Sequence, residues 1–226
     1  MIQDIKIPEE VPVMTLSNTV LFPQAIMPLF IFEPRYRKML SDVLPRNRIF
    51  AVATLDERTK DIEGDEVAYP VAGIGLIRAC RKNSDGNSNL VLQGISRIKF
   101  LSIISEDPYR KARIQKVTSS AGGSKKQIEV CRNQLIHLIQ TQRRLGANIP
   151  EGILQFLCNI DEPENLLDLA IYTLCPSTIL KQELLETRGI VPRYQKFAKF
   201  MEAEIRRLKI NIQLKGDLND DKIGDN

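Results

Sequence analysis

The sequence has no tryptophan, one histidine and no pair of cysteines spaced as Cys-x-x-Cys. A zinc site needs clustered cysteine and histidine ligands, and His137 stands alone in an apolar helical stretch. We therefore expect no metal site, and we expect buried free thiols in a reducing compartment rather than disulfides. The cysteines are Cys80, Cys131, Cys158 and Cys175.

The motifs of the common catalytic sites are also missing. A phosphate-binding loop ends in Gly-Lys-Ser/Thr, and no Gly-Lys pair occurs in the chain. The Gly-Ile-Gly at 73–75 falls inside a predicted strand, where glycine makes room for close backbone packing. The Gly-Gly-Ser-Lys at 122–125 is better explained by a linker and a helix cap than by a Ser-Lys dyad. Without a Gly-x-Ser-x-Gly motif either, the sequence predicts no enzyme and implies no cofactor.

Long apolar runs are missing as well. No segment has the apolar core of a signal peptide or the roughly 20 apolar residues of a membrane span. The formal net charge is only +4 over 226 residues. Such a nearly balanced charge gives no general case for nucleic-acid binding. We therefore expect a soluble cytoplasmic protein without a membrane partner.

The first half of the chain is rich in predicted strands. Apolar and β-branched runs cover residues 11–16, 20–22, 28–32, 49–55, 67–81, 89–92, 97–104 and 109–117. Asp85-Gly86 is a strong signal for a hairpin turn. One helix is expected at 34–44, since Pro34 suits the first helical turn and apolar residues follow at helical spacing.

The second half is predicted to be helical. Ser124 and Gln127 have the spacing of a capping box that begins a helix after a Gly- and Ser-containing linker. Further helices are predicted near 151–159, 164–174, 177–187 and 193–212. We therefore expect an α+β chain with a β-rich subdomain at 1–118, a helical subdomain at 119–214 and a disordered tail at 215–226.

One segment of the sequence is much more specific. Residues 11–23 contain Val-Leu-Phe-Pro, and residues 27–36 read Met-Pro-Leu-Phe-Ile-Phe-Glu-Pro-Arg-Tyr. This pair resembles the opening of the amino-terminal domain family of Lon proteases, in the version typical of stand-alone and eukaryotic members. The glycine-containing strand at 71–77 is also similar to that family, and the segment 89–98 looks like the family's Val-x-Gly-x-x-Arg hairpin strand. The helical segments at 181–186 and 201–208 are similar to it as well, which extends the resemblance over most of residues 11–210.

The resemblance implies a fold and a function. It implies a PUA-like mixed β pseudo-barrel followed by a C-terminal helical bundle, which agrees with the pattern of elements. It also implies a noncatalytic module that recognises unfolded or misfolded polypeptides, with a separate protease as a further candidate partner. The chain departs from the family pattern at Met14, at Ser17-Asn18 and at Gln24, where glycine is usual, and this concerns local loop shape.

Five large apolar residues are the candidates for contacting a polypeptide. They could line an apolar groove, although each residue taken singly fits core burial better. These candidates are Leu21, Phe22, Leu29, Phe30 and Phe32.

Two alternatives remain open. PUA-like folds include RNA-binding proteins, and the basic pairs at 125–126, 143–144 and 206–207 could form a basic face. However, basic and aromatic residues do not interleave as in RNA-binding surfaces. Small-molecule recognition, as in the cereblon branch, would need a further ligand domain, whose cysteine pattern is missing here. The sequence does not indicate an oligomeric state.

Overall fold

The computed structural model describes residues 5–56 and 67–220, with side chains as far as Leu214. The chain divides into two compact units. The barrel unit contains residues 1–119 and 168–188, and the helical unit contains residues 120–167 and 189–226. Residues 168–188, which the sequence placed in the helical subdomain, therefore group with the strands. The expected limits of independent domains at 118 and 214 stay a prediction.

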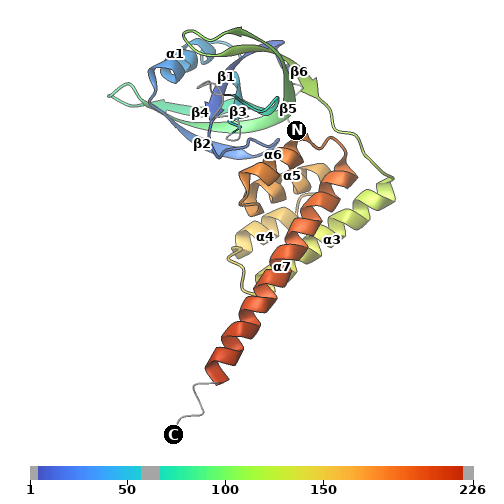
Figure 1. The fold of residues 1–226 in the computed structure, drawn as a ribbon. Helices are drawn as coiled ribbons and strands as arrows, with labels where there is room; N and C mark the ends of the chain where they lie inside the picture. Colours follow the sequence, from blue (N-terminus) through green and yellow to red (C-terminus); the bar gives the residue numbers. More distant parts are fainter. Residues whose placement is uncertain (1–4, 57–66, 221–226) are drawn as a thin grey trace. The chain divides into compact units, whose positions relative to one another are not determined.

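Six strands form one mixed sheet in the barrel unit (Figure 1). Their order is β2-β5-β4-β3-β1-β6, and a further pairing of β5 with β6 joins β1, β3, β4, β5 and β6 into a closed ring. The pair β1–β3 is parallel and the other pairs are antiparallel. This confirms the mixed pseudo-barrel. The strands are β1 (Glu10–Leu16), β2 (Ile26–Ile31), β3 (Ile49–Thr54), β4 (Val71–Lys82), β5 (Ser88–Ser105) and β6 (Lys111–Val117).

Strand β5 is longer than the sequence indicated. The segments predicted at 89–92 and 97–104 are one strand of 18 residues, whose first part pairs with β2 and whose second part pairs with β6. Bulges interrupt its pairing with β6 between Phe100 and Ser102 and between Ile103 and Ser105. Bulges bend a strand, and bending allows one strand to take part in both parts of a barrel.

The apolar segment 20–22 is not a strand, contrary to the prediction. Leu21 and Phe22 are fully buried. A Cβ atom placed on Gly73 would lie 2.1 Å from the Leu21 carbonyl oxygen, and one on Gly94 would lie 1.9 Å from the Phe22 carbonyl oxygen. The two glycines of the sheet therefore allow the backbone of this segment to pack directly on β4 and β5, as expected for Gly73.

The helix α1 (Pro34–Val43) follows the predicted pattern. Proline occupies its first turn, and the buried side chains are Tyr36, Met39, Leu40 and Val43. The Tyr36 hydroxyl donates to the carbonyl of Thr15 and accepts from the amide of the same residue, both at 3.1 Å. These two bonds join α1 to β1.

The loop before β2 shows how the chain accommodates its departures from the family pattern. Asn18 and Gln24 have positive φ angles of 54° and 65°. Asparagine tolerates this left-handed region. Glutamine adopts it with a steric strain that glycine, which lacks a Cβ atom, would not have. The backbone shape is thus kept without the usual glycine.

In the described chain five helices follow β6. They are α3 (Lys125–Arg144), α4 (Glu151–Cys158), α5 (Pro163–Leu174), α6 (Thr178–Glu186) and α7 (Ile190–Asp220). The capping box of Ser124 and Gln127 is present at the start of α3. Helix α7 continues through residues 215–220, where the sequence predicted a disordered tail. Residues 221–226 lie outside the described part of the chain.

The core of the helical unit lies between α3 and α7. Leu135 and Ile139 of α3 are buried, as are Phe197 and Met201 of α7. The buried Arg193 guanidinium donates to Glu164 at 3.0 Å. Leu135 of α3 and Phe197 and Met201 of α7 belong to the helically spaced apolar residues from which these helices are predicted.

Candidate functional site

Strand β2 exposes an apolar face. Ile26 is 50% exposed and Phe30 is 53% exposed, while the intervening Met27 and the last residue Ile31 are buried. Because side chains alternate across a strand, Ile26, Pro28 and Phe30 point to one side of the sheet, and Met27, Leu29 and Ile31 point to the other. Strand β2 lies at the edge of the sheet and exposes two large apolar side chains. Such exposure on an edge strand is a common sign of a binding surface.

Cross-strand pairing extends this face over three strands. Pro28 of β2 lies opposite Val91 of β5, which lies opposite Ala79 of β4. In the next row, Phe30, Asn89 and Arg81 lie opposite one another in the same order. These two rows, together with the row of Leu29, Leu90 and Cys80 between them, line a shallow cavity of about 510 Å³, which we call the outer-face groove. Its lining residues are Pro28, Leu29, Phe30, Ala79, Cys80, Arg81, Asn89, Leu90 and Val91.

An aromatic pair stands at one end of the groove. The rings of Phe30 and Phe32 stack with their centroids 6.0 Å apart and their planes 26° apart. Phe32 is 57% exposed. The stacked pair offers a continuous aromatic surface to a binding partner.

The structure separates the five candidate residues into two groups. Phe30 and Phe32 are exposed, and the half-buried Leu29 lines the outer-face groove. Leu21 and Phe22 are fully buried beneath the sheet, so a polypeptide cannot reach them in this structure. For these two residues the alternative of core burial holds.

Sequence reasoning missed the other residues of the exposed face and of the groove. Ile26 and Pro28 share the exposed face with Phe30, and the alternation along 26–31 was the signal that could have found them. Val91 and Arg81 join the groove only through strand pairing, which the sequence does not indicate directly.

Helix α5 meets the start of β2. The Tyr172 hydroxyl donates to the Ile26 carbonyl at 3.2 Å, and the Lys181 ammonium of α6 lies 5.3 Å from the centre of the Tyr172 ring. Burial raises the pKa of Tyr172 and lowers the pKa of Lys181. Partial removal of both groups from water explains both directions, because burial disfavours each charged form.

Polar side chains border the exposed face. The Arg78 guanidinium donates to Gln93 at 2.6 Å, and the Gln93 amide in turn donates to Gln24 at 3.5 Å. These bonds hold the long polar side chains along the strands, away from the aromatic pair. The surface therefore combines an apolar centre with a polar border, as protein-binding surfaces do.

Two other residues considered for catalysis lie on α3 or at its start. His137 is exposed on α3, and Ser124 is engaged as a helix cap. Within residues 5–56 and 67–220, no three His, Cys, Asp or Glu side chains gather as metal ligands would. The helices of that same part include none with the length and apolarity required to cross a membrane.

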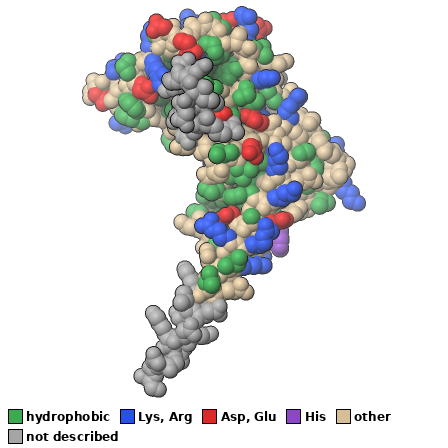
Figure 2. Space-filling model, in the orientation of Figure 1, with side chains coloured by type: hydrophobic (Ala, Val, Ile, Leu, Met, Phe, Trp, Pro, Cys, Tyr) green, Lys and Arg blue, Asp and Glu red, His purple; other side chains and the backbone are tan. Residues whose placement is uncertain are grey.

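The basic pairs named for RNA binding lie on α3 and α7. Arg143 is paired with Glu151, and Arg207 with Glu204 at 3.6 Å. Figure 2 shows Lys and Arg side chains interspersed with acidic and neutral ones on the face that it displays. No observation here favours RNA, which stays an untested alternative.

Comparison with known proteins shows which family has this architecture. Residues 10–203 match the family model described as the ATP-dependent protease La (LON) substrate-binding domain. The chain belongs to this family. Lon protease of Desulfosudis oleivorans is 31% identical over 218 residues, and Lon protease of Dictyoglomus thermophilum is 26% identical over 215 residues. The alignments cover 96% and 95% of this LON substrate-binding domain chain but only 26% and 27% of the two relatives.

Solved structures support the fold. The N-terminal domain of Mycobacterium avium complex Lon protease aligns with a TM-score of 0.66 at 16% identity, covering 85% of this chain and 98% of that one. A Lon N-terminal domain protein from Xanthomonas campestris aligns with a TM-score of 0.63 at 17% identity, with the same coverage. At these identities the similarity concerns the fold. It confirms the barrel and helices of a LON substrate-binding domain.

Proposed function

We propose that this LON substrate-binding domain is a noncatalytic module that binds unfolded polypeptides through the outer-face groove and the Phe30–Phe32 pair. The observation that carries the proposal is the exposure of Ile26, Phe30 and Phe32 at 50%, 53% and 57% beside an apolar groove. An unfolded chain exposes apolar side chains, and burying them against this surface removes apolar area of both partners from water.

The geometry suits an extended segment. The two cross-strand rows give the groove a width of three strands, and the stacked rings close one end of it. Arg81 and Asn89 on the second row supply a cation and an amide that can hydrogen-bond to backbone carbonyls of a bound chain. Specificity for sequence would be low, since apolar contacts are nondirectional.

The absence of catalysis belongs to the same proposal. The family model that matches this chain describes a substrate-binding domain. The two relatives named above are proteases, and this chain covers about a quarter of the length of each. The groove is lined by apolar residues, one arginine, one asparagine and one cysteine, which is not a hydrolytic constellation. A protease that acts on the bound polypeptides is the partner we propose.

The test uses the full chain and a fluorescent polypeptide kept unfolded by reduction and alkylation. Binding is followed by fluorescence anisotropy for the original protein and for the double variant Phe30→Ser with Phe32→Ser. We expect the variant to bind at least about tenfold more weakly, as for loss of a central aromatic contact. The matched control is Phe156→Ser, which removes a phenylalanine that is 58% exposed on α4, outside the groove.

The outcomes separate the alternatives. Unchanged affinity in the double variant, or an equal loss in Phe156→Ser, would reject the groove as the binding surface. ATP hydrolysis or proteolysis by the purified original protein would reject the noncatalytic role. Binding of a mixed RNA pool with a strong salt dependence, without polypeptide binding, would favour the RNA alternative.

A further inference from the structure

A second cavity lies between α1 and the paired ends of β4 and β5. It has a volume of about 520 Å³. Ser88 and Lys82, which lie opposite each other on β5 and β4, line it, whereas the neighbouring pair Asn89 and Arg81 lines the outer-face groove. We call this cavity the basic cavity, and it is lined by Pro34, Arg37, Lys38, Leu40, Ser41, Leu44, Cys80, Lys82, Gly86 and Ser88.

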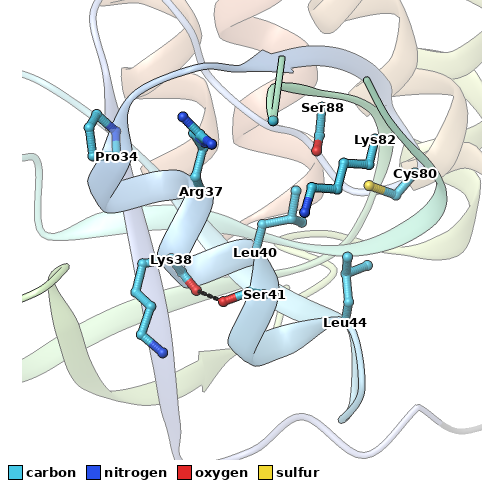
Figure 3. Close-up of a pocket in the computed structure, with 10 residues that line it drawn as sticks. Pro34, Arg37, Lys38, Leu40, Ser41, Leu44, Cys80, Lys82 and Ser88 are labelled. Atoms are coloured by element: carbon cyan, nitrogen blue, oxygen red, sulfur yellow. Dashed lines mark hydrogen bonds between the residues drawn. The ribbon is translucent and has the colours of Figure 1, made fainter. Parts of the chain in front are cut away.

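Three of the lining side chains are cations, and none is an acid. The Lys38 ammonium is compensated, since it donates to Asp42 at 2.7 Å, and Figure 3 shows it pointing away from Lys82 and Ser88. In the same view Lys82 extends from the end of β4 toward Leu40 of α1.

The acids of the surrounding elements are already engaged. Asp42 also accepts from the Tyr109 hydroxyl at 3.0 Å. Asp85, at the turn between β4 and β5, accepts from the amide and the side chain of Asn87 at 2.9 and 2.8 Å. Among residues 5–56 and 67–214, Arg37 and Lys82 therefore have no carboxylate partner, which leaves two positive charges at the cavity.

The cavity also holds one neutral donor, the Ser88 hydroxyl, and a guanidinium that lies against a turn. Ser88 is 5% exposed, and its hydroxyl lies on the cavity side of β5 beside Lys82 (Figure 3). A Cβ atom placed on Gly86 would lie 2.1 Å from Nη2 of Arg37, and Gly86 has a φ of 83°. The turn is thus glycine both for its left-handed backbone and because the Arg37 guanidinium packs directly against it.

We propose that the basic cavity binds one phosphate group. Two uncompensated cations match the charge of a phosphate, which is about −1.5 to −2 at neutral pH. A guanidinium donates in a fork that fits two phosphate oxygens, while the ammonium and the Ser88 hydroxyl donate singly. The apolar side chains of Pro34, Leu40 and Leu44 leave room for the body of a small phosphorylated molecule. The basic cavity shares only Cys80 with the residues that line the outer-face groove, and this proposal does not depend on polypeptide binding there.

The test titrates the full chain with inorganic phosphate at constant ionic strength and follows amide resonances by NMR. We expect saturable shifts that are largest at 37–41 and 82–88. Lys82→Gln and Arg37→Gln are each expected to weaken binding about tenfold. Arg81→Gln is the matched control, because it removes the same charge from the adjacent residue on the opposite face and should change affinity less than about twofold.

Non-saturable shifts, or equal weakening by Arg81→Gln, would overturn the site by showing only general charge screening. Acetate binding as tightly as phosphate would also overturn it, since a monoanion would then suffice. Phosphoserine, glucose 6-phosphate and a phosphoserine peptide serve as further probes. Tighter binding of the sugar phosphate assigns the site to small molecules, and tighter binding of the peptide assigns it to modified polypeptides.

Discussion

Arg97 and Asp168 form a two-pronged ion pair across 71 positions of the sequence, with nitrogen–oxygen distances of 2.8 and 2.6 Å. Both side chains are almost entirely buried, at 3% and 1% exposure. The guanidinium also donates to the Leu185 carbonyl at 3.1 Å and lies 5.8 Å from the centre of the Phe22 ring. Because α6 adds a bond from Gln182 to the Val71 carbonyl, residues 168–188 are attached to the barrel by polar contacts.

Removing one partner of the Arg97–Asp168 pair should lower the stability of the folded chain strongly. Asp168→Ala leaves a buried guanidinium without its carboxylate, and we expect a loss of about 3–5 kcal/mol in the free energy of unfolding. The measurement is urea unfolding of the full chain followed by circular dichroism. The comparison is Glu10→Ala, which breaks the exposed pair with Arg113 and should cost less than about 1 kcal/mol. Similar losses in the two variants would contradict the role of burial.

The contact of Gly94 with the backbone at Phe22 gives a second prediction. Gly94→Ala brings a Cβ to 1.9 Å from the Phe22 carbonyl oxygen, so the sheet or the loop must shift. We expect the free energy of unfolding to fall by about 1–3 kcal/mol or more. Gly152→Ala in α4 is the control, since nothing lies within 4 Å of its added Cβ, and it should gain up to about 1 kcal/mol. A neutral Gly94→Ala would show that the close approach is relaxed in solution.

Sequence patterns within a few residues were sufficient to predict most of the helices, strands and turns. The capping box at Ser124, the apolar face of α1 and the hairpin turn at Asp85-Gly86 depend on residues within a few positions of one another, and all three are present. Arg97 was part of a recognised motif, but its partner Asp168 could not be predicted. Their meeting depends on how α5 packs against the barrel, and local patterns do not contain that information.

The candidate site was predicted only in part for a related reason. Phe22 and Phe30 are the same residue type in similar apolar runs, yet one is fully buried and the other is exposed. The backbone at Phe22 packs closely against Gly94, a contact between distant parts of the sequence. Hydrophobicity alone could not separate them, whereas the alternation along β2 distinguishes Phe30 from its buried neighbours.

This difference predicts effects of different size for the same substitution at the two positions. Phe22→Ala empties a fully buried position and should lower the free energy of unfolding by about 3–5 kcal/mol. Phe30→Ala removes a side chain that is 53% exposed and should change it by less than about 1 kcal/mol. Urea unfolding measures both values. A large loss for Phe30→Ala would mean that this residue serves the core rather than a binding surface.

The bond between Tyr109 and Asp42 predicts how the barrel responds to alkaline pH. Tyr109 is buried, and burial, with the adjacent Asp42 carboxylate as a further cause, raises its pKa to about 12. A raised pKa means that folding favours the protonated phenol. The stabilisation is therefore complete below the ordinary tyrosine pKa of 10.0 and is lost as the pH rises toward about 12.

Tyrosinate absorbance tests this response directly. In a titration of the folded chain, we expect a component near pH 12 that Tyr109→Phe removes and that Asp42→Asn moves to lower pH, because the charged acceptor is gone. Circular dichroism at each pH verifies that the chain remains folded, and the urea-unfolded chain should titrate near pH 10 throughout. If the titration component near pH 12 persists unchanged in Tyr109→Phe, another tyrosine produces it. The bond between α1 and the segment before β6 would then not control stability at high pH.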